Sequence, residues 1–308
     1  MRAVVHDPEA SAGLSLRTVP DPVPRRDQAL IEVRAASLNF VDIGFPADRG
    51  RPWSVPGMDA AGVVVEAAAD GSGPPPGTRV ASFGWEAGAW AELRAADTAD
   101  LAVVPDAVDL GAASALPAAG VTALRALRAL GPVVGRRVLV TGASGGVGRF
   151  AVQLAARAGA YVIAAVGGPD RAAGLRELGA DEVVTDLRDV TAPVFGVLEN
   201  VGGALLAEAF GLVEPGGCAQ SIGMASREPT TIDFEQERLA GGRKRLEPFN
   251  VGREAFGPDL AYLVDLLAQG ALDPQIGWRG SWERAPEAAE ALLARRVRGK
   301  AVLDIGSA

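Results

Sequence analysis

The segment "VLVTGASGGVGRFAVQLAARAGAYVIAAV", Val138 to Val166, constrains the fold more than any other part of the chain. A short apolar run leads into a glycine-rich turn, then an amphipathic stretch with helical spacing, then a second apolar run. Small residues at the turn let the chain pass directly from a buried strand into a helix. The segment therefore predicts a β-α-β unit of a parallel sheet, because parallel neighbours need a crossover helix.

Within this unit the turn fits the pattern [GA]-x-G-x-x-G and consists of Ala143, Ser144, Gly145, Gly146, Val147 and Gly148. The small first position allows a tight turn, the middle glycine lets backbone amides approach a pyrophosphate, and the last lets helix and strand pack closely. The N-terminus of the following helix favours negative charge. We interpret the turn as a dinucleotide-binding site, since it follows a predicted strand and opens a helix.

The end of the second strand bears on the choice of cofactor. It reads Ala165-Val166-Gly167-Gly168, with no acid there to bind a ribose 2′-hydroxyl, and Arg171 follows. A cation at this point suits the 2′-phosphate of NADPH; the alternative interpretation is a solvated residue in the first turn of a helix. Asp186, after the third predicted strand, would repel that phosphate unless Arg188 or Arg171 compensates. We expect NADPH, with NADH as the alternative.

The sequence pattern changes near Asp109. Before it, short β-rich runs separated by proline and glycine predict a barrel-like β-domain, with strands over 29–37, 60–68, 78–83 and 89–96. After it, Pro117 separates two helices, and strands then alternate with helices, including a predicted helix over 169–180. The residues 237–249 are expected to form a basic loop, and two helices and a strand close the chain.

Composition excludes several classes of protein. The 308 residues carry a formal net charge of −8, which argues against a nucleic-acid partner. No apolar run reaches the ~18–20 residues needed to cross a bilayer, and no leader pattern is evident, so we expect a cytoplasmic protein without a membrane partner. The single cysteine, Cys218, permits no internal disulfide.

Several further segments resemble the medium-chain dehydrogenase/reductase superfamily, and specifically its zinc-independent, quinone oxidoreductase-like branch. They are "LNFVD", "PGMDAAGVV", "GTRVASFGWEAGAWAE", "LPAAGVTALRAL", "VTGASGGVG", "RELGADEVV" and "GKAVLDI". The resemblance spans nearly the whole chain. It implies a GroES-like β-barrel domain (1–116 and 254–308), a Rossmann domain (117–253), a cleft active site and a homodimer.

The resemblance also implies roles for individual residues. Asn39 is expected near the nicotinamide and substrate, Thr122 near the carboxamide, and Gly223 beside the nicotinamide. Local alternatives are a turn role for Asn39 and a helix N-cap for Thr122. The expected catalytic residues are Asn39, Asp42 and Trp53, and the expected cofactor-binding residues are Thr122, Ala143, Ser144, Gly145, Gly146, Val147, Gly148, Gly167, Arg171, Val201, Gly223 and Phe249.

Residues that related enzymes use are missing. Catalytic zinc needs three protein ligands, usually His or Cys, whereas His6 and Cys218 are the only two such residues here. We expect no metal, a surface or turn position for His6 and a core position for Cys218. Many relatives carry a tyrosine after N-x-x-D, where this chain has Trp53. Because indole is no practical acid, the proton is expected from solvent, or from Asp42 if burial raises its pKa.

Three hypotheses follow. The first is a zinc-independent, NAD(P)H-dependent reductase that transfers hydride to a quinone, enone or similar conjugated carbonyl. The second is a specialised biosynthetic reductase, of polyketide-tailoring or enoyl type, whose pocket is shaped by Trp53 and the loop around Phe45–Arg51. The third is a non-catalytic NADPH-binding protein.

Overall fold

A computed structural model describes residues 1–44 and 51–306. The chain divides into two compact units, of which the first comprises 1–121 and 253–308 and the second 122–252. The division falls between Val121 and Thr122, inside a helix that the sequence prediction assigned entirely to the second domain. The first turn of that helix is bonded to the first unit, because the Ala118 amide donates to Asp59 Oδ1 over 3.0 Å.

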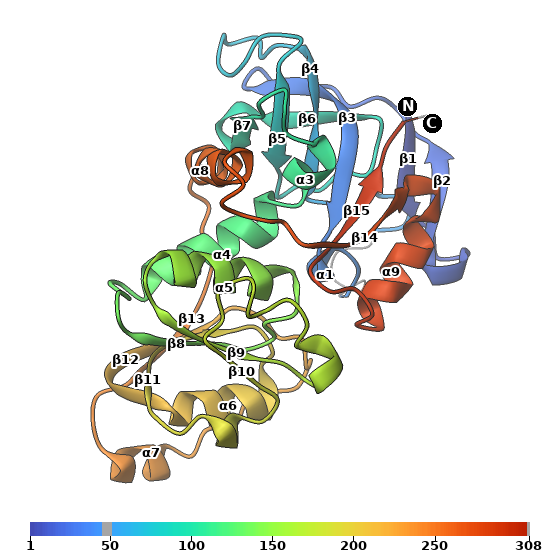
Figure 1. The fold of residues 1–308 in the computed structure, drawn as a ribbon. Helices are drawn as coiled ribbons and strands as arrows, with labels where there is room; N and C mark the ends of the chain where they lie inside the picture. The colour runs from blue at the N-terminus through green and yellow to red at the C-terminus, as the bar shows by residue number, and fades with distance from the viewer. Residues whose placement is uncertain (45–50, 307–308) are drawn as a thin grey trace. The chain divides into compact units, whose positions relative to one another are not determined.

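The first unit is built around a seven-stranded sheet, visible with the paired β1 and β2 in Figure 1. Along the sheet the order is β14-β15-β3-β4-β5-β7, and β6 pairs with β3. Its strands are β1 (Arg2–His6), β2 (Leu14–Thr18), β3 (Gln28–Leu38), β4 (Asp59–Glu66), β5 (Arg79–Phe83), β6 (Leu93–Asp97), β7 (Leu101–Val103), β14 (Ile276–Ser281) and β15 (Lys300–Asp304). Its helices are α1 (Phe40–Ile43), α3 (Leu110–Ser114), the start of α4 (Pro117–Ala129), α8 (Gly257–Ala268) and α9 (Ala285–Leu293).

Long β-branched and alanine-rich strands form this sheet because they bury one or both faces. Val33, Trp90 and Leu303 belong to its main core with Trp282, and each fully buried large apolar side chain stabilises the fold by about 1.5–3 kcal/mol. The predicted strand over 89–96 was too long: β6 begins at Leu93, and Ala91 forms only a bridge with Ala3. The two helices separated at Pro117 are confirmed as α3 and α4.

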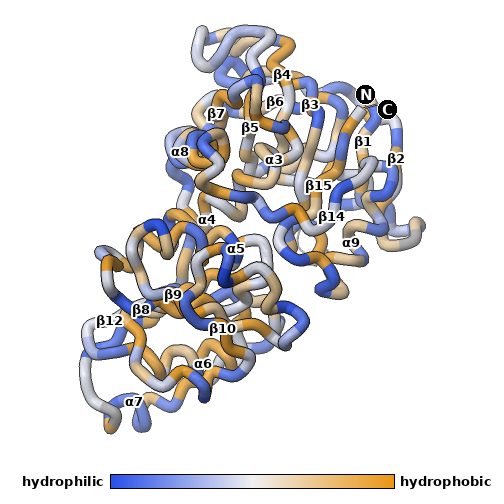
Figure 2. The backbone as a smooth tube through the Cα atoms, in the orientation of Figure 1, coloured by the Kyte–Doolittle hydropathy of each residue, from blue (hydrophilic) through white to orange (hydrophobic). Residues whose placement is uncertain are grey.

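The second unit contains a six-stranded parallel sheet in the order β10-β9-β8-β11-β12-β13. Its strands are β8 (Arg137–Val140), β9 (Tyr161–Ala165), β10 (Glu182–Val184), β11 (Val194–Glu199), β12 (Val213–Ser221) and β13 (Arg245–Pro248), and its helices include α5 (Gly146–Arg157), α6 (Gly203–Gly211) and α7 (Phe234–Ala240). Hydrophobic residues fill β8 and β9, and α5 and α6 cover opposite faces of the sheet (Figures 1 and 2).

This strand order creates a switch point between β8 and β11. From β8 the chain proceeds outward through β9 and β10, then returns to β11 and proceeds the other way through β12 and β13. The loops that follow β8 and β11 therefore lead to opposite faces, which leaves a crevice at the carboxyl ends of the strands. The Rossmann-type unit predicted from the sequence is confirmed.

Two local predictions in this unit were wrong. The segment 169–180 is not an α-helix: only the 3₁₀ turn η3 (Pro169–Arg171) forms, followed by irregular turns. Gly174 has φ +79 there, a conformation that a right-handed helix excludes. The segment 237–249 is not simply a loop, because it contains the end of α7 and the edge strand β13, which pairs with β12.

Candidate functional site

In the second unit, the glycine-rich turn is held between the ends of β8 and β9. The Ala143 amide donates to Ala165 O at 3.1 Å, the Gly145 amide to Gly142 O at 2.9 Å, and α5 begins at Gly146 with Gly145 as its N-cap. A Cβ at Gly148 would lie 2.4 Å from Gly142 O and 2.6 Å from Ala143 Cα. Only glycine allows α5 to approach the turn this closely, which is the geometry that a pyrophosphate-binding turn needs.

The other expected cofactor residues of this unit follow the carboxyl ends of its strands. Gly167 comes just after β9, Val201 after β11, Gly223 after β12 and Phe249 directly after β13. Hydrogen bonds from their backbone amides hold three of them: the Val201 amide donates to the side-chain oxygen Glu199 Oε1, the Gly223 amide to Glu199 O, and the Phe249 amide to Ser221 O. Because all these strands are parallel, the sheet brings the residues to one edge of the unit.

Thr122 lies well inside α4, which begins at Pro117. It is partly buried. The alternative interpretation of Thr122 as a helix N-cap is therefore wrong, because a cap residue must precede the helix.

Two arginines converge on Ser144 of the turn. Arg171 Nε donates to Ser144 Oγ at 3.1 Å, while the buried Arg149 donates to Ser144 O at 3.4 Å and to Ala173 O at 2.8 Å. Arg171 therefore stands beside the turn, and Arg149 ties the turn to the segment that follows η3. The sequence interpretation missed Arg149, although an arginine in the apolar face of a helix is a recognisable signal.

The acid that argued against a 2′-phosphate is paired with a cation. The Asp186 carboxylate accepts from Arg188 Nε at 2.9 and 3.0 Å and forms an ion pair with the same guanidinium. These bonds lower the pKa of Asp186 to about 2. A second acid had been overlooked: a Cβ on Gly168 would lie 3.0 Å from Asp170 Oδ1, so this carboxylate lies beside the end of β9.

Glu199, another residue that the sequence interpretation missed, orders the loop after β11. Its fully buried carboxylate accepts from Thr141 Oγ1 at 2.8 Å and from the amides of Val201 and Gly202 at 2.8 and 2.9 Å. Burial raises the pKa of this carboxyl, and the hydrogen bonds oppose that rise. The sequence signal was an acid at the end of an otherwise apolar strand.

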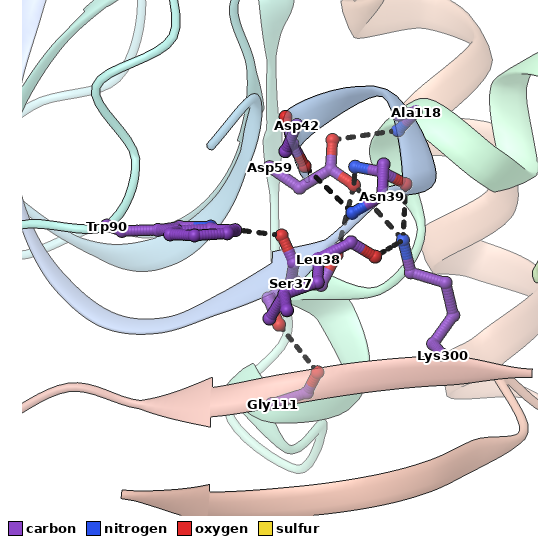
Figure 3. A network of polar contacts seen from close by, with 10 residues as sticks. Ser37, Leu38, Asn39, Asp42, Asp59, Trp90, Gly111, Ala118 and Lys300 are labelled. Atoms are coloured by element: carbon purple, nitrogen blue, oxygen red, sulfur yellow. Dashed lines mark hydrogen bonds and ion pairs between the residues drawn. The ribbon is translucent and has the colours of Figure 1, made fainter. Parts of the chain in front are cut away.

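In the first unit, Asn39 and Asp42 belong to one polar network that also includes Asp59 and Lys300 (Figure 3). The backbone amide of Asn39, the N-cap residue of α1, donates to Asp42 Oδ2 at 2.8 Å. The Asn39 side chain donates through Nδ2 to Asp59 Oδ2 at 2.8 Å, and its Oδ1 accepts from Lys300 Nζ at 2.6 Å. Sequence reasoning did not identify Asp59 and Lys300, which are 0% and 2% exposed.

Burial raises the pKa of the Asp42 carboxyl to about 7, with the negative charge of Asp59 adding to the rise and Lys300 opposing it. Arg94, also buried, is electrostatically coupled to the same acids. The carboxyl that the sequence suggested as a possible acid therefore has a raised pKa.

This shift predicts a pH-dependent stability. Since the folded pKa exceeds the unfolded value of about 3.9, native protein binds more protons between these values, and the free energy of unfolding falls as pH rises from about 4 to 7. Asp42→Asn keeps an acceptor for the Asn39 amide and removes the titration. Relative to wild type, the free energy of unfolding of this variant should rise by on the order of 2–4 kcal/mol between pH 4 and pH 8, as measured by urea unfolding. Asp186→Asn should show no such gain, and a pH-independent Asp42→Asn difference would refute the assignment.

Trp53 is half exposed and has φ +70. Its amide donates to His6 O at 2.8 Å, and the Arg17 guanidinium lies 5.5 Å from its ring centroid. Within the described residues, these contacts do not join Trp53 to Asn39 and Asp42. The residues 45–50 of the loop proposed to shape the pocket lie outside the described residues.

The residues present do not fit a zinc site. No group of three or more His, Cys, Asp or Glu residues able to hold a metal occurs within residues 1–44 and 51–306. Cys218 is buried in β12, accepts a hydrogen bond from Gln220, and has a thiol pKa raised to about 11, chiefly by burial. His6 ends β1 and is partly buried, which lowers its pKa.

Across the same described ranges, no helix is both long and apolar enough to cross a membrane.

Comparison with known proteins matches both units. The family model described as alcohol dehydrogenase GroES-like domain matches residues 25–106, and that described as zinc-binding dehydrogenase matches residues 146–269. The chloroplastic quinone-oxidoreductase QR1 of Triphysaria versicolor is 30% identical, over 99% of this chain and 98% of its own length. Erythronolide synthase EryA2 of Saccharopolyspora erythraea is 34% identical over 92% of this chain, which spans only 8% of that synthase.

Solved structures match along their whole length. The quinone oxidoreductase from Coxiella burnetii has 28% identity and a TM-score of 0.85, covering 99% of each chain. Mycobacterial Rv1454c complexed with NADPH has 27% identity and a TM-score of 0.86, covering 99% of this chain and 100% of its own. With the β8-α5 turn and the two units described above, these matches show that the chain belongs to the quinone oxidoreductase-like branch of the medium-chain dehydrogenase/reductase superfamily, a family of NAD(P)H-using oxidoreductases.

Proposed function

We propose that this protein is a metal-free, NADPH-preferring reductase of quinones, enones or similar conjugated carbonyls. The single observation that carries the proposal is the close approach at Gly148 beside Arg171, which fits a phosphorylated dinucleotide. A bound reduced nicotinamide would supply the hydride. The turn would hold the pyrophosphate, Arg171 the 2′-phosphate, and Thr122, Gly167, Val201, Gly223 and Phe249 the remainder of the cofactor.

For the reaction itself, we propose that Asn39 contacts the substrate and that Asp42 or solvent supplies the proton. Hydride addition to a conjugated carbonyl places negative charge on the oxygen, and one proton then completes the product. Asn39 is partly exposed, and its amide is held by charged neighbours. The role of Trp53 in shaping the substrate pocket remains part of the proposal.

The test is an acceptor panel. Purified protein should oxidise NADPH in stopped-flow mixing with at least one quinone or enone, with one NADPH consumed per molecule of acceptor reduced. Cofactor binding without turnover of any acceptor would refute the proposal and support the non-catalytic alternative. NADPH binding itself, followed by its fluorescence, separates that outcome from a failure to bind cofactor.

The similarity to part of EryA2 favours one second candidate, a polyketide-related enoyl reductase. The same panel distinguishes it when it includes short enoyl thioesters. A turnover number at least about tenfold higher with a thioester than with any quinone or simple enone, a difference of about 1.4 kcal/mol in activation free energy, would favour this candidate.

Arg171 gives a prediction about cofactor choice. Arg171→Ala should weaken NADPH binding by about 10- to 100-fold, because a charge-assisted hydrogen bond contributes about 1.5–3 kcal/mol, and should leave NADH binding nearly unchanged. Fluorescence titration with each cofactor measures both constants. Arg176→Ala is a matched control, because Arg176 lies in the same segment and bonds instead to Asp181 O. Equal losses for NADPH and NADH would show that Arg171 only supports the turn.

We further propose a cytoplasmic homodimer without nucleic-acid or membrane partners. The strand β13 lies at the edge of its sheet and pairs there with β12. Its other side offers backbone groups with which a second copy of the chain could pair. Light scattering of the purified protein measures the oligomeric state.

A further inference from the structure

A buried ion pair lies behind Asn39 in the first unit. Lys300, at the start of β15, and Asp59, at the start of β4, are almost completely buried. Their closest polar atoms, Lys300 Nζ and Asp59 Oδ2, are 3.5 Å apart. A buried pair of this kind is weak evidence for a stabilising role, because its desolvation cost rivals its attraction. Its place beside a half-buried amide calls for another explanation.

The ammonium group uses all three of its donors within the network. Lys300 Nζ donates to Leu38 O at 3.1 Å, to Asn39 Oδ1 at 2.6 Å and toward Asp59 Oδ2 at 3.5 Å (Figure 3). The Asp59 carboxylate is equally engaged: it also accepts from Ser37 Oγ at 3.0 Å and from the Ala118 amide at 3.0 Å. Neither charge is therefore left without partners, and both are held in place by strands and by the first turn of α4.

These contacts determine which way the Asn39 amide faces. The Lys300 ammonium lies at Oδ1 and the Asp59 carboxylate at Nδ2. A flipped side-chain amide would place its N–H group against the ammonium and its oxygen against the carboxylate, and both contacts would be repulsive. An amide nitrogen carries two hydrogens. One is donated to Asp59 Oδ2 at 2.8 Å, and the Asn39 side chain also interacts with the Asp42 carboxyl. Because the side-chain oxygen accepts from Lys300, the N–H side is the part of the amide that can act toward a substrate oxygen.

We propose that Lys300 and Asp59 are positioning residues that lock Asn39 as an N–H donor for the carbonyl oxygen that becomes negative during reduction. The inference rests on the proposed function. It adds the orientation of the Asn39 side-chain amide and the negative substrate oxygen to which that amide donates. The ammonium at Oδ1 polarises the amide and strengthens its N–H as a donor, since linked hydrogen bonds reinforce one another. A preorganised donor aimed at developing negative charge is a major source of rate enhancement.

The decisive variant removes both charges together. Lys300→Met alone leaves Asp59 buried without its cation and is expected to destabilise the protein strongly. The double variant Asp59→Asn/Lys300→Met keeps an acceptor for Asn39 Nδ2 and removes one negative and one positive charge together, so it should fold with stability closer to that of wild type than Lys300→Met. Its turnover number should nevertheless fall on the order of 10-fold, with the KM for NADPH unchanged.

Asp304→Asn/Arg279→Met is the matched control. It makes corresponding substitutions in an exposed pair on the neighbouring strands β15 and β14, where Arg279 Nε donates to Asp304 at 3.0 and 3.1 Å. Turnover by this control should equal that of wild type. A purely structural role for Lys300 and Asp59 predicts instead that the buried double variant, once folded, turns over as fast as the control.

A second readout does not depend on turnover. A phenol whose ionised form absorbs visible light, 4-nitrophenol, serves as the probe. Wild type should bind the phenolate preferentially and lower the apparent pKa of the bound probe, and the buried double variant should lose most of that shift. An unchanged ionisation of the probe with wild type, or the same shift with both proteins, would overturn the inference. If the shift is present but no acceptor is reduced, the proposed function fails while the donor assignment stands.

Discussion

Replacing Gly148 by alanine should abolish tight binding of NADPH. The new Cβ would lie 2.4 Å from Gly142 O, 2.6 Å from Ala143 Cα and 2.8 Å from Ala143 C, all of them backbone atoms that cannot rotate away. The N-terminus of α5 must therefore move away from the β8 turn. We expect a stability loss of about 1–3 kcal/mol, typical of overpacking, and at least ~100-fold weaker binding because amides that contact a pyrophosphate must be placed closely.

Fluorescence titration with NADPH and thermal unfolding measure these two effects. Gly211→Ala is the control, since Gly211 ends α6, has no positive φ and would place its Cβ 3.7 Å from Glu237 Oε1. Alanine there should retain wild-type binding and add up to about 1 kcal/mol of helix stability. Normal NADPH affinity in folded Gly148→Ala protein would contradict the assignment of the turn.

Removing the Asn39 amide should produce the largest loss of catalysis in the first unit. Asn39→Ala deletes the N–H that we propose as the donor to the substrate oxygen and leaves Lys300 without its 2.6 Å partner. Loss of one such donor typically lowers turnover about 10²- to 10³-fold. NADPH binding should change little, because the turn and Arg171 belong to the second unit.

Asn39→Asp separates donation from packing. It keeps the side-chain shape and the acceptor for Lys300, but it replaces the N–H donor by a carboxylate oxygen that faces Asp59 Oδ2, so its turnover should fall at least as far as that of Asn39→Ala. Asn250→Ala, which removes an exposed amide that accepts from the Gly252 amide, should leave turnover unchanged. Steady-state kinetics with the best acceptor of the panel measure all three, and an Asn39→Asp enzyme as fast as wild type would exclude the donor role.

Where hydrophobic period and turn chemistry agreed, the sequence predicted the elements correctly. The β8-α5-β9 unit was predicted with a helix opening at the glycine-rich turn, and α5 does begin within that turn, at Gly146. The helix predicted over 169–180 from the alternation of strands and helices is wrong, because Gly174, with φ +79, interrupts any helix there. β13 was missed because a short edge strand carries polar side chains and depends on pairing with β12.

The residues of the candidate site also differ in whether the sequence pattern could predict them. Residues of the glycine-rich turn follow one another in the chain, so their pattern alone located them. Asp59 and Lys300 are 20 and 261 positions from Asn39, and no spacing rule connects them. Arg149 and Glu199 were visible as polar residues in apolar elements, but their partners were not.

The sequence by itself determined the family and the parallel sheet, and it predicts the place where a dinucleotide would bind, because these depend on local period and on small residues at a turn. Only the tertiary structure decided that Asp186 is paired with Arg188, that Arg171 stands beside Ser144, and that Lys300 and Asp59 orient Asn39. The physical reason is that hydrogen bonds between side chains depend on how the folded backbone places them: Asn39, Asp59 and Lys300 meet only because strands β3, β4 and β15 lie together in one sheet, and Arg171 meets Ser144 only because the segment after β9 folds back beside the glycine-rich turn.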